Sequence, residues 1–311
     1  MKKILITGGA GYIGSILTPN LLSEGYKVTV LDNLLFRQNT LLECCDNKNF
    51  NFVYGDCRNE ETIKELLKEA DVIIPLAAIV GFPACKRDPL SAKTINFEAV
   101  KMINDLRSKN QQVIYPTTNS GYGATTGEVY CTEETPLNPI SLYGRTKADA
   151  EQLLLASENT VTFRLATVFG MSPRMRVDLL VNDFTYQAVT NGSIILFQKD
   201  FKRNFLHVRD AAACFAFTIE HFDEMKGETY NVGLNEANLS KEELALEIKK
   251  QIPNFYITSA EIDSDPDKRN YIVSNDKINA KGFFAKHTIQ QGVRELIVGY
   301  KILSRRAYTN L

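Results

Sequence analysis

The segment Ile4–Gly14 reads Ile-Leu-Ile-Thr-Gly-Gly-Ala-Gly-Tyr-Ile-Gly. An apolar run typical of a buried strand ends at Thr7, and glycines follow at positions 8, 11 and 14. This spacing permits a tight turn, close approach of the backbone to a diphosphate, and close packing of the following helix on the strand. The free N–H groups at the start of that helix favour phosphate. The segment therefore predicts a dinucleotide-binding strand–turn–helix unit.

A carboxylate follows the second strand-like run, because Asp32 comes directly after Val28–Leu31. At this position a carboxylate accepts hydrogen bonds from the adenosine ribose and repels a 2′-phosphate. The next basic residue along the chain is Arg37. The sequence therefore predicts NAD rather than NADP as the cofactor. The alternative is an ordinary helix N-terminus beside a solvated aspartate.

The first half of the chain alternates apolar runs with amphipathic segments. Strands are expected at Ile4–Thr7, Val28–Leu31, Phe52–Tyr54, Val72–Pro75, Val113–Pro116 and Val161–Leu165. Helices are expected at Tyr12–Glu24, Glu60–Ala70, Leu90–Lys109 and Tyr143–Ser157. Strands that are apolar on both faces and alternate with helices indicate a parallel sheet covered by helices. We expect an α/β fold with a Rossmann-type, doubly wound parallel sheet.

The pattern loosens after about residue 170. Helices are expected near Asp178–Thr190, Asp210–His221 and Lys241–Gln251, a strand near Ile194–Phe197, and an acidic loop at Asp263–Lys268. We expect an NAD-binding domain over residues 1–170, with returning segments near 204–235. Residues 171–311 are expected to form mainly a smaller C-terminal substrate-binding cap.

Composition excludes several classes of function. The formal net charge of the 311 residues is −1, so no broad basic surface is expected to bind nucleic acid. The six cysteines form no Cys-x-x-Cys pair and only three histidines occur, which argues against a zinc site. The first apolar run is too short for a signal peptide, and no run approaches the roughly 20 residues of a membrane span. We expect a cytoplasmic protein.

A phenol and an ammonium lie four residues apart at Tyr143 and Lys147, on one face if the segment is helical. A phenol with a pKa near 10 becomes a base at neutral pH only when a nearby cation stabilises its phenolate. The pattern is weak by itself, because 13 tyrosines should give about one such match by chance. Its position is informative. Thr118 follows the fifth strand, whose carboxyl end should border the ligand crevice.

In these features the chain resembles the extended short-chain dehydrogenase/reductase family, the NAD-dependent sugar-nucleotide epimerases and dehydratases. The shared motifs span nearly the whole chain. They are Gly8-x-x-Gly11-x-x-Gly14, Asp32-Asn33, Gly55-Asp56, Leu76-Ala77-Ala78, Asn96, Thr117-Thr118, Tyr143-x-x-x-Lys147, Phe205–Asp210 and Tyr230–Gly233.

The resemblance implies a role for each matching residue. Tyr143 would take the proton from a sugar hydroxyl, normally at C4, as hydride leaves to NAD. Lys147 would bind the nicotinamide ribose, Thr118 would hold the hydroxyl, and Asn96 would order water or backbone near Lys147. The implied cofactor contacts are Gly8, Gly11, Tyr12, Ile13, Gly14, Asp32, Asn33, Asp56, Cys57, Leu76, Ala77, Ala78, Tyr143 and Lys147. The implied substrate contacts are Thr118, Asn119, Ser120, Thr167, Asp178, Arg203 and Arg269, with the two arginines on the diphosphate or, alternatively, solvated.

The residues after Thr118 narrow the reaction. Family members that eliminate water across C5–C6 carry an acidic residue there, whereas this chain has Asn119 and Ser120. Members that epimerise C3 and C5 use a cysteine at the position of Ser120 and a downstream histidine, which the segment after Arg164 lacks. Two outcomes of C4 oxidation remain. The 4-keto sugar is either reduced again on its other face, giving a C4 epimer, or released.

Several residues favour release. Thr167 and Asp178 depart from the galactose epimerase pattern, which puts a uridine-linked sugar in doubt. Tyr115–Gly123 and Arg176–Asn182 resemble dehydrogenases of bacterial capsule heptose pathways, which act at C4 of GDP-manno-heptose. A regulator that binds NAD without catalysis is disfavoured, because Tyr143 and Lys147 are both present. Two helical segments, Leu90–Lys109 and Tyr143–Ser157, resemble the pair that forms the family's dimer interface, so a homodimer is expected. The alternative is that their apolar positions are ordinary core contacts with the sheet.

Overall fold

The computed structural model describes residues 1–37, 39–126, 128–260 and 269–303. The loop predicted at Asp263–Lys268 lies outside these described residues. The chain divides into two compact units. Unit 1 comprises Met1–Thr118, Ser141–Arg164 and Ala212–Tyr230, and unit 2 comprises Asn119–Ile140, Leu165–Ala211 and Asn231–Leu311. The functional division into a cofactor domain and a substrate cap stays a prediction.

Unit 1 is built on a seven-stranded sheet with the strand order β11-β7-β5-β4-β1-β2-β3. The strands are β1 (Lys3–Thr7), β2 (Lys27–Asp32), β3 (Phe50–Tyr54), β4 (Val72–Pro75), β5 (Gln112–Thr118), β7 (Thr160–Leu165) and β11 (Glu228–Val232). β1 pairs in parallel with β2 and β4, and β2 and β4 pair in parallel with β3 and β5. The order reverses at β1, as in a doubly wound sheet. The predicted Rossmann-type α/β fold is confirmed.

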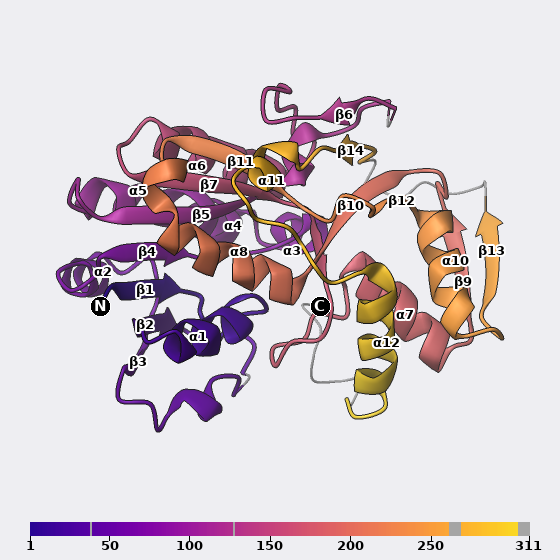
Figure 1. Ribbon diagram of the computed structural model, residues 1–311, viewed down its shortest axis with the longest axis horizontal. Coiled ribbons are helices and arrows are strands. Elements are labelled where there is room, and N and C mark those ends of the chain that lie inside the picture. Colours follow the sequence, from indigo (N-terminus) through magenta and orange to yellow (C-terminus); the bar gives the residue numbers. More distant parts are fainter. Residues whose placement is uncertain (38, 127, 261–268, 304–311) are drawn as a thin grey trace. The chain divides into compact units, whose positions relative to one another are not determined.

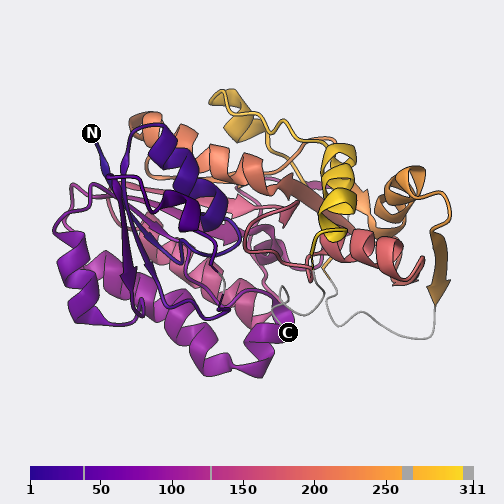
Figure 2. The ribbon, with the colours of Figure 1, turned by 90° about the horizontal axis from the view of Figure 1, so that it is seen from below.

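Different helices cover the two faces of this sheet (Figure 2). α1 (Gly14–Ser23) and α8 (Val208–Glu220, in unit 1 from Ala212) lie on one face. On the other face lie α2 (Glu60–Leu67), α5 (Ala99–Leu106) and α6 (Leu142–Leu155). An apolar cluster lies under these three helices, beside the buried polar side chains of α6. Its buried members include Leu5, Leu31, Ile63, Leu67, Ile73, Val100, Ile103, Val113, Tyr115, Ala150 and Leu154.

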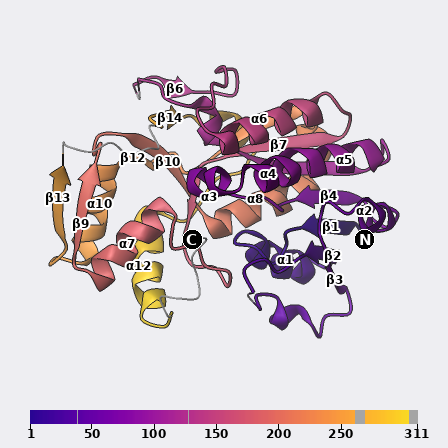
Figure 3. The ribbon, with the colours of Figure 1, turned by 180° about the vertical axis from the view of Figure 1, so that it is seen from behind.

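The elements of the first half closely follow the expectation. The six predicted strands are present, with ends displaced by at most two residues. The helix predicted at Leu90–Lys109 is instead a run of three segments, α4 (Pro89–Lys93), a π-helical turn η2 (Thr94–Glu98) and α5. A further short helix, α3 (Phe82–Arg87), was not predicted. α3, α4 and α5 all pack against α6 (Figure 3).

The described residues of unit 2 form three small sheets. They pair β12 (Asn238–Ser240) and β8 (Thr167–Phe169) with β10 (Lys202–His207), β13 (Tyr256–Ala260) with β9 (Ser193–Phe197), and β14 (Ile272–Val273) with β6 (Tyr130–Cys131). The helix predicted near Asp178 begins at Leu180 and forms α7 (Leu180–Thr190), which lies beside α12 (Ile289–Tyr300) (Figure 1). α10 (Lys241–Gln251) has the predicted bounds, whereas α12 was not predicted.

Side-chain caps fix where several helices begin. Ser141 Oγ accepts a hydrogen bond from the Gly144 N–H at the start of α6, and Ser240 and Thr288 form capping boxes with Glu243 and Gln291 at the starts of α10 and α12. The remaining short elements are η1 (Leu42–Cys44), η3 (Asn119–Tyr122), α9 (Phe222–Met225) and α11 (Asp276–Ala280). Throughout the described ranges, every helix is too short or too polar to cross a bilayer.

Candidate active site

The glycine-rich loop between β1 and α1 is packed most tightly at Gly8 and Gly14 and less tightly at Gly11. A Cβ on Gly8, whose φ is +73°, would lie 2.5 Å from the backbone nitrogen of Ala77. A Cβ on Gly14 would lie 2.4 Å from the carbonyl oxygen of Gly9. At Gly11 a Cβ would meet only the Gly8 carbonyl oxygen, at 3.0 Å. The loop therefore leaves space for a ligand beside Gly11.

The start of α1 provides hydrogen-bond donors for that ligand. Its N-cap residue is Ile13, whose side chain forms no capping hydrogen bond. The first N–H groups of a helix have no intrahelical acceptors, and together with the helix dipole they attract anions. The loop and helix start thus fit the diphosphate of a dinucleotide.

Asp32 connects the end of β2 to the glycine-rich loop. One of its carboxylate oxygens accepts the N–H of Ala10 at 3.0 Å, and the other accepts the N–H of Leu34 at 2.8 Å. The side chain is half-buried. Each oxygen retains further lone pairs, so a half-buried anion remains where a ribose would approach. Asn33, the next residue, is exposed and accepts the Leu35 N–H at 3.1 Å.

Two of the predicted cofactor contacts, Asp56 and Cys57, follow β3. Asp56 forms an ion pair with Arg58 at 2.6 Å, and these hydrogen bonds lower the pKa of the Asp56 carboxyl. Burial raises the pKa of the neighbouring Cys57 thiol to about 12, so this cysteine is an inert neutral group. Another predicted cofactor contact, Tyr12, follows Gly11 in the glycine-rich loop and is buried, with 8% of its surface exposed.

Asn96 holds the segment that follows β4. Its side chain lies in η2 and is fully buried. The amide oxygen accepts the N–H of Ile79 at 2.8 Å, and the amide nitrogen donates to the Ile79 carbonyl at 2.9 Å. The same nitrogen lies 3.4 Å from Thr146 Oγ1 on α6. Asn96 thus fixes the backbone directly after Leu76, Ala77 and Ala78, which are partly exposed.

Tyr143 and Lys147 lie one turn apart on α6, as their spacing predicted. The Lys147 side chain is buried, and its Nζ lies 3.9 Å from the centre of the Tyr115 ring. Among the described residues, none forms a hydrogen bond with this nitrogen. Burial is the main cause that lowers the pKa of Lys147 to about 7. An ammonium here is poorly solvated and has all its donors available for a ligand.

Thr118 is the last residue of β5, the strand on which α6 packs. The next residue, Asn119, is only 1% exposed, and both polar atoms of its amide have no hydrogen-bond partner within the described part of the chain. A buried amide without partners costs free energy, so this one suits a polar ligand or a bound water.

The predicted substrate residues of unit 2 fall into two groups. Ser120 Oγ accepts a hydrogen bond from the Arg269 guanidinium, so the structure brings these two together. Arg203 is buried beside Tyr271, two residues after Arg269, with its guanidinium carbon 5.4 Å from the ring centre. Asp178 is instead paired with Arg176 at 2.5 Å, and Thr167 lies in β8.

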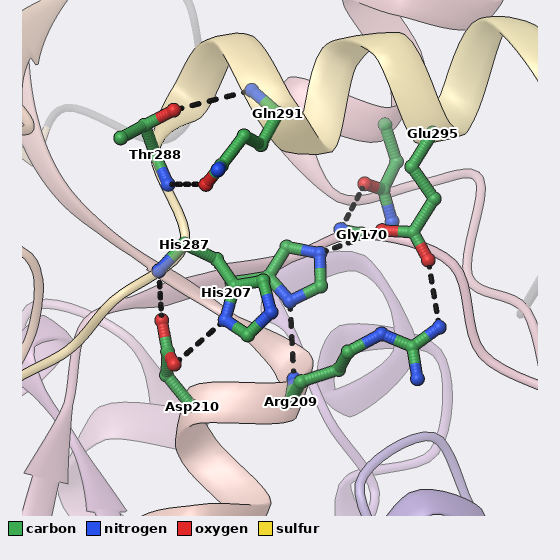
Figure 4. Close-up of polar contacts among 9 residues, drawn as sticks. Gly170, His207, Arg209, Asp210, His287, Thr288, Gln291 and Glu295 are labelled. Atoms are coloured by element: carbon green, nitrogen blue, oxygen red, sulfur yellow. Dashed lines mark hydrogen bonds and ion pairs between the residues drawn. The ribbon is translucent and has the colours of Figure 1, made fainter.

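Two clusters of polar and charged side chains, each with buried members, were not predicted from the sequence. The first, here called the Glu151 cluster, joins Glu151 to Arg164 and Thr117 in unit 1. The second, here called the histidine cluster, comprises His207, Arg209, Asp210, His287 and Glu295 in unit 2 (Figure 4). Glu151 lies four residues after Lys147, and this spacing was a signal that the analysis did not use. No local pattern links Asp210 to His287.

The comparison with known families decides which family the fold and site represent. A family model described as the NAD dependent epimerase/dehydratase family matches residues 4–233. The chain belongs to this family. It is therefore an NAD-dependent enzyme of the epimerase/dehydratase type, and the prediction of NAD made from Asp32 is confirmed.

Curated relatives of this family member share about a quarter of its residues. It is 26% identical to dTDP-glucose 4,6-dehydratase of Streptomyces niveus over 96% of this chain and 93% of that protein. It is 28% identical to CDP-paratose 2-epimerase of Salmonella typhi, over 94% and 98% respectively. The match to UDP-glucuronic acid decarboxylase 1 of Xenopus tropicalis, also 28% identical, covers 63% of this chain and spans about half, 48%, of that relative.

Solved structures share the fold. UDP-glucuronic acid 4-epimerase from Bacillus cereus, in complex with UDP-glucuronic acid and NAD, has a TM-score of 0.86 and 24% identity over 97% of this chain and all of that one. dTDP-glucose 4,6-dehydratase from Bacillus anthracis, in complex with NAD, has a TM-score of 0.83 and 23% identity over 99% of both chains.

Proposed function

We propose that this enzyme oxidises C4 of a sugar carried on a nucleotide diphosphate, with Tyr143 as the base. The observation that carries the proposal is Lys147. It is a buried lysine one helical turn from Tyr143, and its ammonium has no hydrogen-bond acceptor among the described side chains and backbone groups. A fold that serves only for binding gains nothing from burying such a charge, which is costly.

In the proposed reaction, the Tyr143 phenolate takes the proton of the C4 hydroxyl, and Thr118 holds that hydroxyl in line. Lys147 stabilises the phenolate electrostatically and donates hydrogen bonds to the cofactor ribose. When bound, NAD supplies a hydride acceptor for the C4 hydrogen. The glycine-rich loop and the start of α1 would hold its diphosphate, and Asp32 its adenosine ribose.

For the substrate, we propose GDP-manno-heptose, released as its 4-keto product in the synthesis of capsule sugars. This assignment rests on the resemblance of Tyr115–Gly123 and Arg176–Asn182 to dehydrogenases of that class. Asn119 and Ser120 support oxidation without elimination, because neither side chain is an acid or base at neutral pH. Arg203 and Arg269 would contact the diphosphate.

The alternative product is the C4 epimer. The same residues would form the epimer if the 4-keto sugar rotated in the site and took back the hydride on its other face. No residue of the proposed set distinguishes release of the 4-keto sugar from this second reduction. The curated relatives named above carry UDP, dTDP and CDP in their names, so the test must include sugars on these nucleotides as well.

The decisive experiment incubates the pure enzyme and NAD with GDP-, UDP-, dTDP- and CDP-linked sugars, with and without 2-oxo acids, and identifies products by mass spectrometry and NMR. A 4-keto sugar whose yield rises with the concentration of the 2-oxo acid, which would reoxidise NADH, supports the dehydrogenase. A C4 epimer formed without an acceptor replaces it with the epimerase. Products lacking the elements of water would overturn both. Size-exclusion chromatography with light scattering tests the expected homodimer.

A further inference from the structure

The face of α6 that carries Tyr143 and Lys147 continues to a third ionisable residue, Glu151. The three residues are spaced by four, so they follow one another along one side of the helix. The Glu151 side chain is 2% exposed. Carboxylates are almost never buried to this degree unless they are paired, so its partners reveal what holds it there.

Glu151 connects α6 to two neighbouring strands of the sheet. One carboxylate oxygen accepts hydrogen bonds from Arg164 on β7, at 3.0 Å from Nε and 2.7 Å from a terminal nitrogen. The other oxygen accepts the hydroxyl of Thr117 on β5 at 2.7 Å. Thr117 directly precedes Thr118. The carboxylate is therefore held as an anion, in a fixed position relative to the strand that carries the predicted substrate-positioning hydroxyl.

Lys147 depends on this anion for its charge. Burial disfavours the ammonium and lowers its pKa, while Glu151 is the largest opposing influence, followed by Cys85 on α3. Burial raises the pKa of Cys85 to about 11, so its thiol is neutral at neutral pH. Tyr115 is neutral as well, because burial raises its pKa well above the usual value. Of the described groups that favour the ammonium, Glu151 alone is an anion at neutral pH.

The charged groups on the other helices packed against α6 lie at the surface. On α3, Lys86 and Arg87 are both exposed. On α4 and η2, Lys93 pairs with Glu98 at 3.5 Å, and on α5, Lys101 pairs with Asp105; both pairs are exposed. η2 presents the neutral amide of Asn96 towards α6. Glu151 therefore remains the main group that stabilises the ammonium of Lys147.

We propose that Glu151, held by Arg164 and Thr117, is a positioning residue that keeps Lys147 in its ammonium form and thereby sets the basicity of Tyr143. This inference rests on the proposed roles of Tyr143 and Lys147, and it adds a residue to which no role has been assigned. Glu151 acts through Lys147 and is not itself a catalytic residue.

The test measures the ionisation of Lys147 directly. NMR of the full-length protein with isotope-labelled lysine, loaded with NAD, gives its titration midpoint once the Lys147→Met spectrum has identified the signal. In Glu151→Gln, which keeps the shape and loses the charge, the midpoint should fall by on the order of one pH unit or more. Glu151→Asp should restore much of the shift. Thr117→Val, which removes one hydrogen bond and keeps the anion, should stay close to wild type.

The rate should follow the same change. Because the reaction needs the ammonium, activity is lost as pH rises through the Lys147 midpoint, and this alkaline limb should move to lower pH in Glu151→Gln by the same amount. A variant with a lower melting temperature but an unchanged Lys147 midpoint would show a purely structural role and overturn the proposal. The NMR measurement needs no sugar, so it remains decisive even if no nucleotide sugar is oxidised.

Folding of the single variant is controlled by a second one. Removing one member of a buried ion pair is destabilising, whereas replacing both by apolar side chains is often tolerated. Glu151→Leu combined with Arg164→Met removes the pair as a unit. It should show the same fall in the Lys147 midpoint, and a midpoint equal to wild type in this double variant would overturn the proposal.

Discussion

The Glu151 cluster of unit 1 and the histidine cluster of unit 2 both contain buried charged side chains that are paired within the cluster, but among the described residues only the Glu151 cluster has a buried, unpaired ammonium one helical turn away. Beside the Glu151 cluster, the Lys147 ammonium lies over an aromatic ring with no acceptor in the described part of the chain. In the histidine cluster, the buried His207 and Asp210 are each paired with a partly exposed side chain, Glu295 and His287 respectively (Figure 4). The first arrangement leaves donors for a ligand, and the second consumes them.

The pairing in the histidine cluster is detailed. His207 Nδ1 accepts the backbone N–H of Arg209 at 3.2 Å, so we assign the ring proton to Nε2, which lies 2.7 Å from Glu295. Glu295 also accepts the Arg209 guanidinium at 3.0 Å. The Asp210 carboxylate accepts a hydrogen bond from Nδ1 of the His287 ring at 2.8 Å. It also accepts hydrogen bonds from the backbone N–H groups of Lys286 and His287.

The two imidazole rings stack, with centres 4.6 Å apart. The histidine cluster therefore fastens the segment before and within α12 to the end of β10 and the start of α8 in unit 2. A comparison of the two clusters teaches that burial of charge does not by itself indicate catalysis. The distinguishing feature is a buried donor that the protein leaves unpaired.

The largest expected effect is kinetic and belongs to unit 1. Tyr143→Phe should lower kcat between about 10²- and 10⁴-fold, because it removes the proton acceptor, while NAD still binds. Rapid-mixing kinetics and NADH fluorescence titration measure the two quantities. Asp210→Asn, as the matched variant from the histidine cluster, should leave kcat within a few-fold of wild type at a temperature where it is folded. Equal losses of kcat in both variants would contradict the proposed difference between the catalytic role of Tyr143 and the structural role of the histidine cluster.

The next effect is a dependence of stability on pH. The folded pKa of Lys147, about 7, lies below the ordinary lysine value of 10.5. Between these values the unfolded chain binds more protons, so the free energy of unfolding should rise as pH increases from about 7 to 10.5. Lys147→Met should remove this rise, which is on the order of a few kcal/mol. Lys101→Met, at an exposed ion pair, serves as the control, and the same loss of slope there would contradict the assignment.

Asp210→Asn should be destabilising by roughly 1.5–3 kcal/mol, because a buried charged acceptor of three hydrogen bonds becomes a neutral amide. Urea unfolding at neutral pH measures this change. Asp223→Asn, which affects an exposed pair with Lys226, should leave the urea midpoint close to that of wild type. A stability equal to wild type for Asp210→Asn would mean that the histidine cluster does not hold α12 in place.

The smallest effect is an acid-dependent loss of stability in the histidine cluster. Burial raises the pKa of the Glu295 carboxyl, but hydrogen bonds from His207 and Arg209 outweigh it and bring this pKa below its ordinary value of 4.5. Stability from this carboxylate is therefore fully present above pH 4.5 and is lost as pH falls through the lower folded pKa. Glu295→Gln should flatten the stability profile below pH 4.5 and leave the alkaline rise assigned to Lys147 unchanged. Loss of the alkaline rise in this variant would show that the two clusters are coupled.

Much of unit 1 could be predicted because its signals are local. The run Ile4–Thr7 and the glycines at 8, 11 and 14 specify a strand, a turn and a helix within a few residues. The spacing of Tyr143 and Lys147 specified one face of α6. Boundaries were less accurate where a turn changed type. The π-helical turn at Thr94–Glu98, which brings Asn96 against Ile79, has no periodic signature in the sequence.

By itself, then, the sequence determined the doubly wound sheet, the preference for NAD and the Tyr–Lys pair, since strand period, glycine spacing and helical spacing are encoded over a few neighbouring residues. Only the tertiary structure decided that Lys147 lies buried over Tyr115, that Arg164 and Thr117 hold Glu151, and that Asp210 binds His287. The residues in these contacts are far apart along the chain. The separation is 13 positions for Glu151 and Arg164, 32 for Lys147 and Tyr115, and 77 for Asp210 and His287. Such pairings depend on how the helices pack on the sheet, and no local pattern of residues specifies that packing.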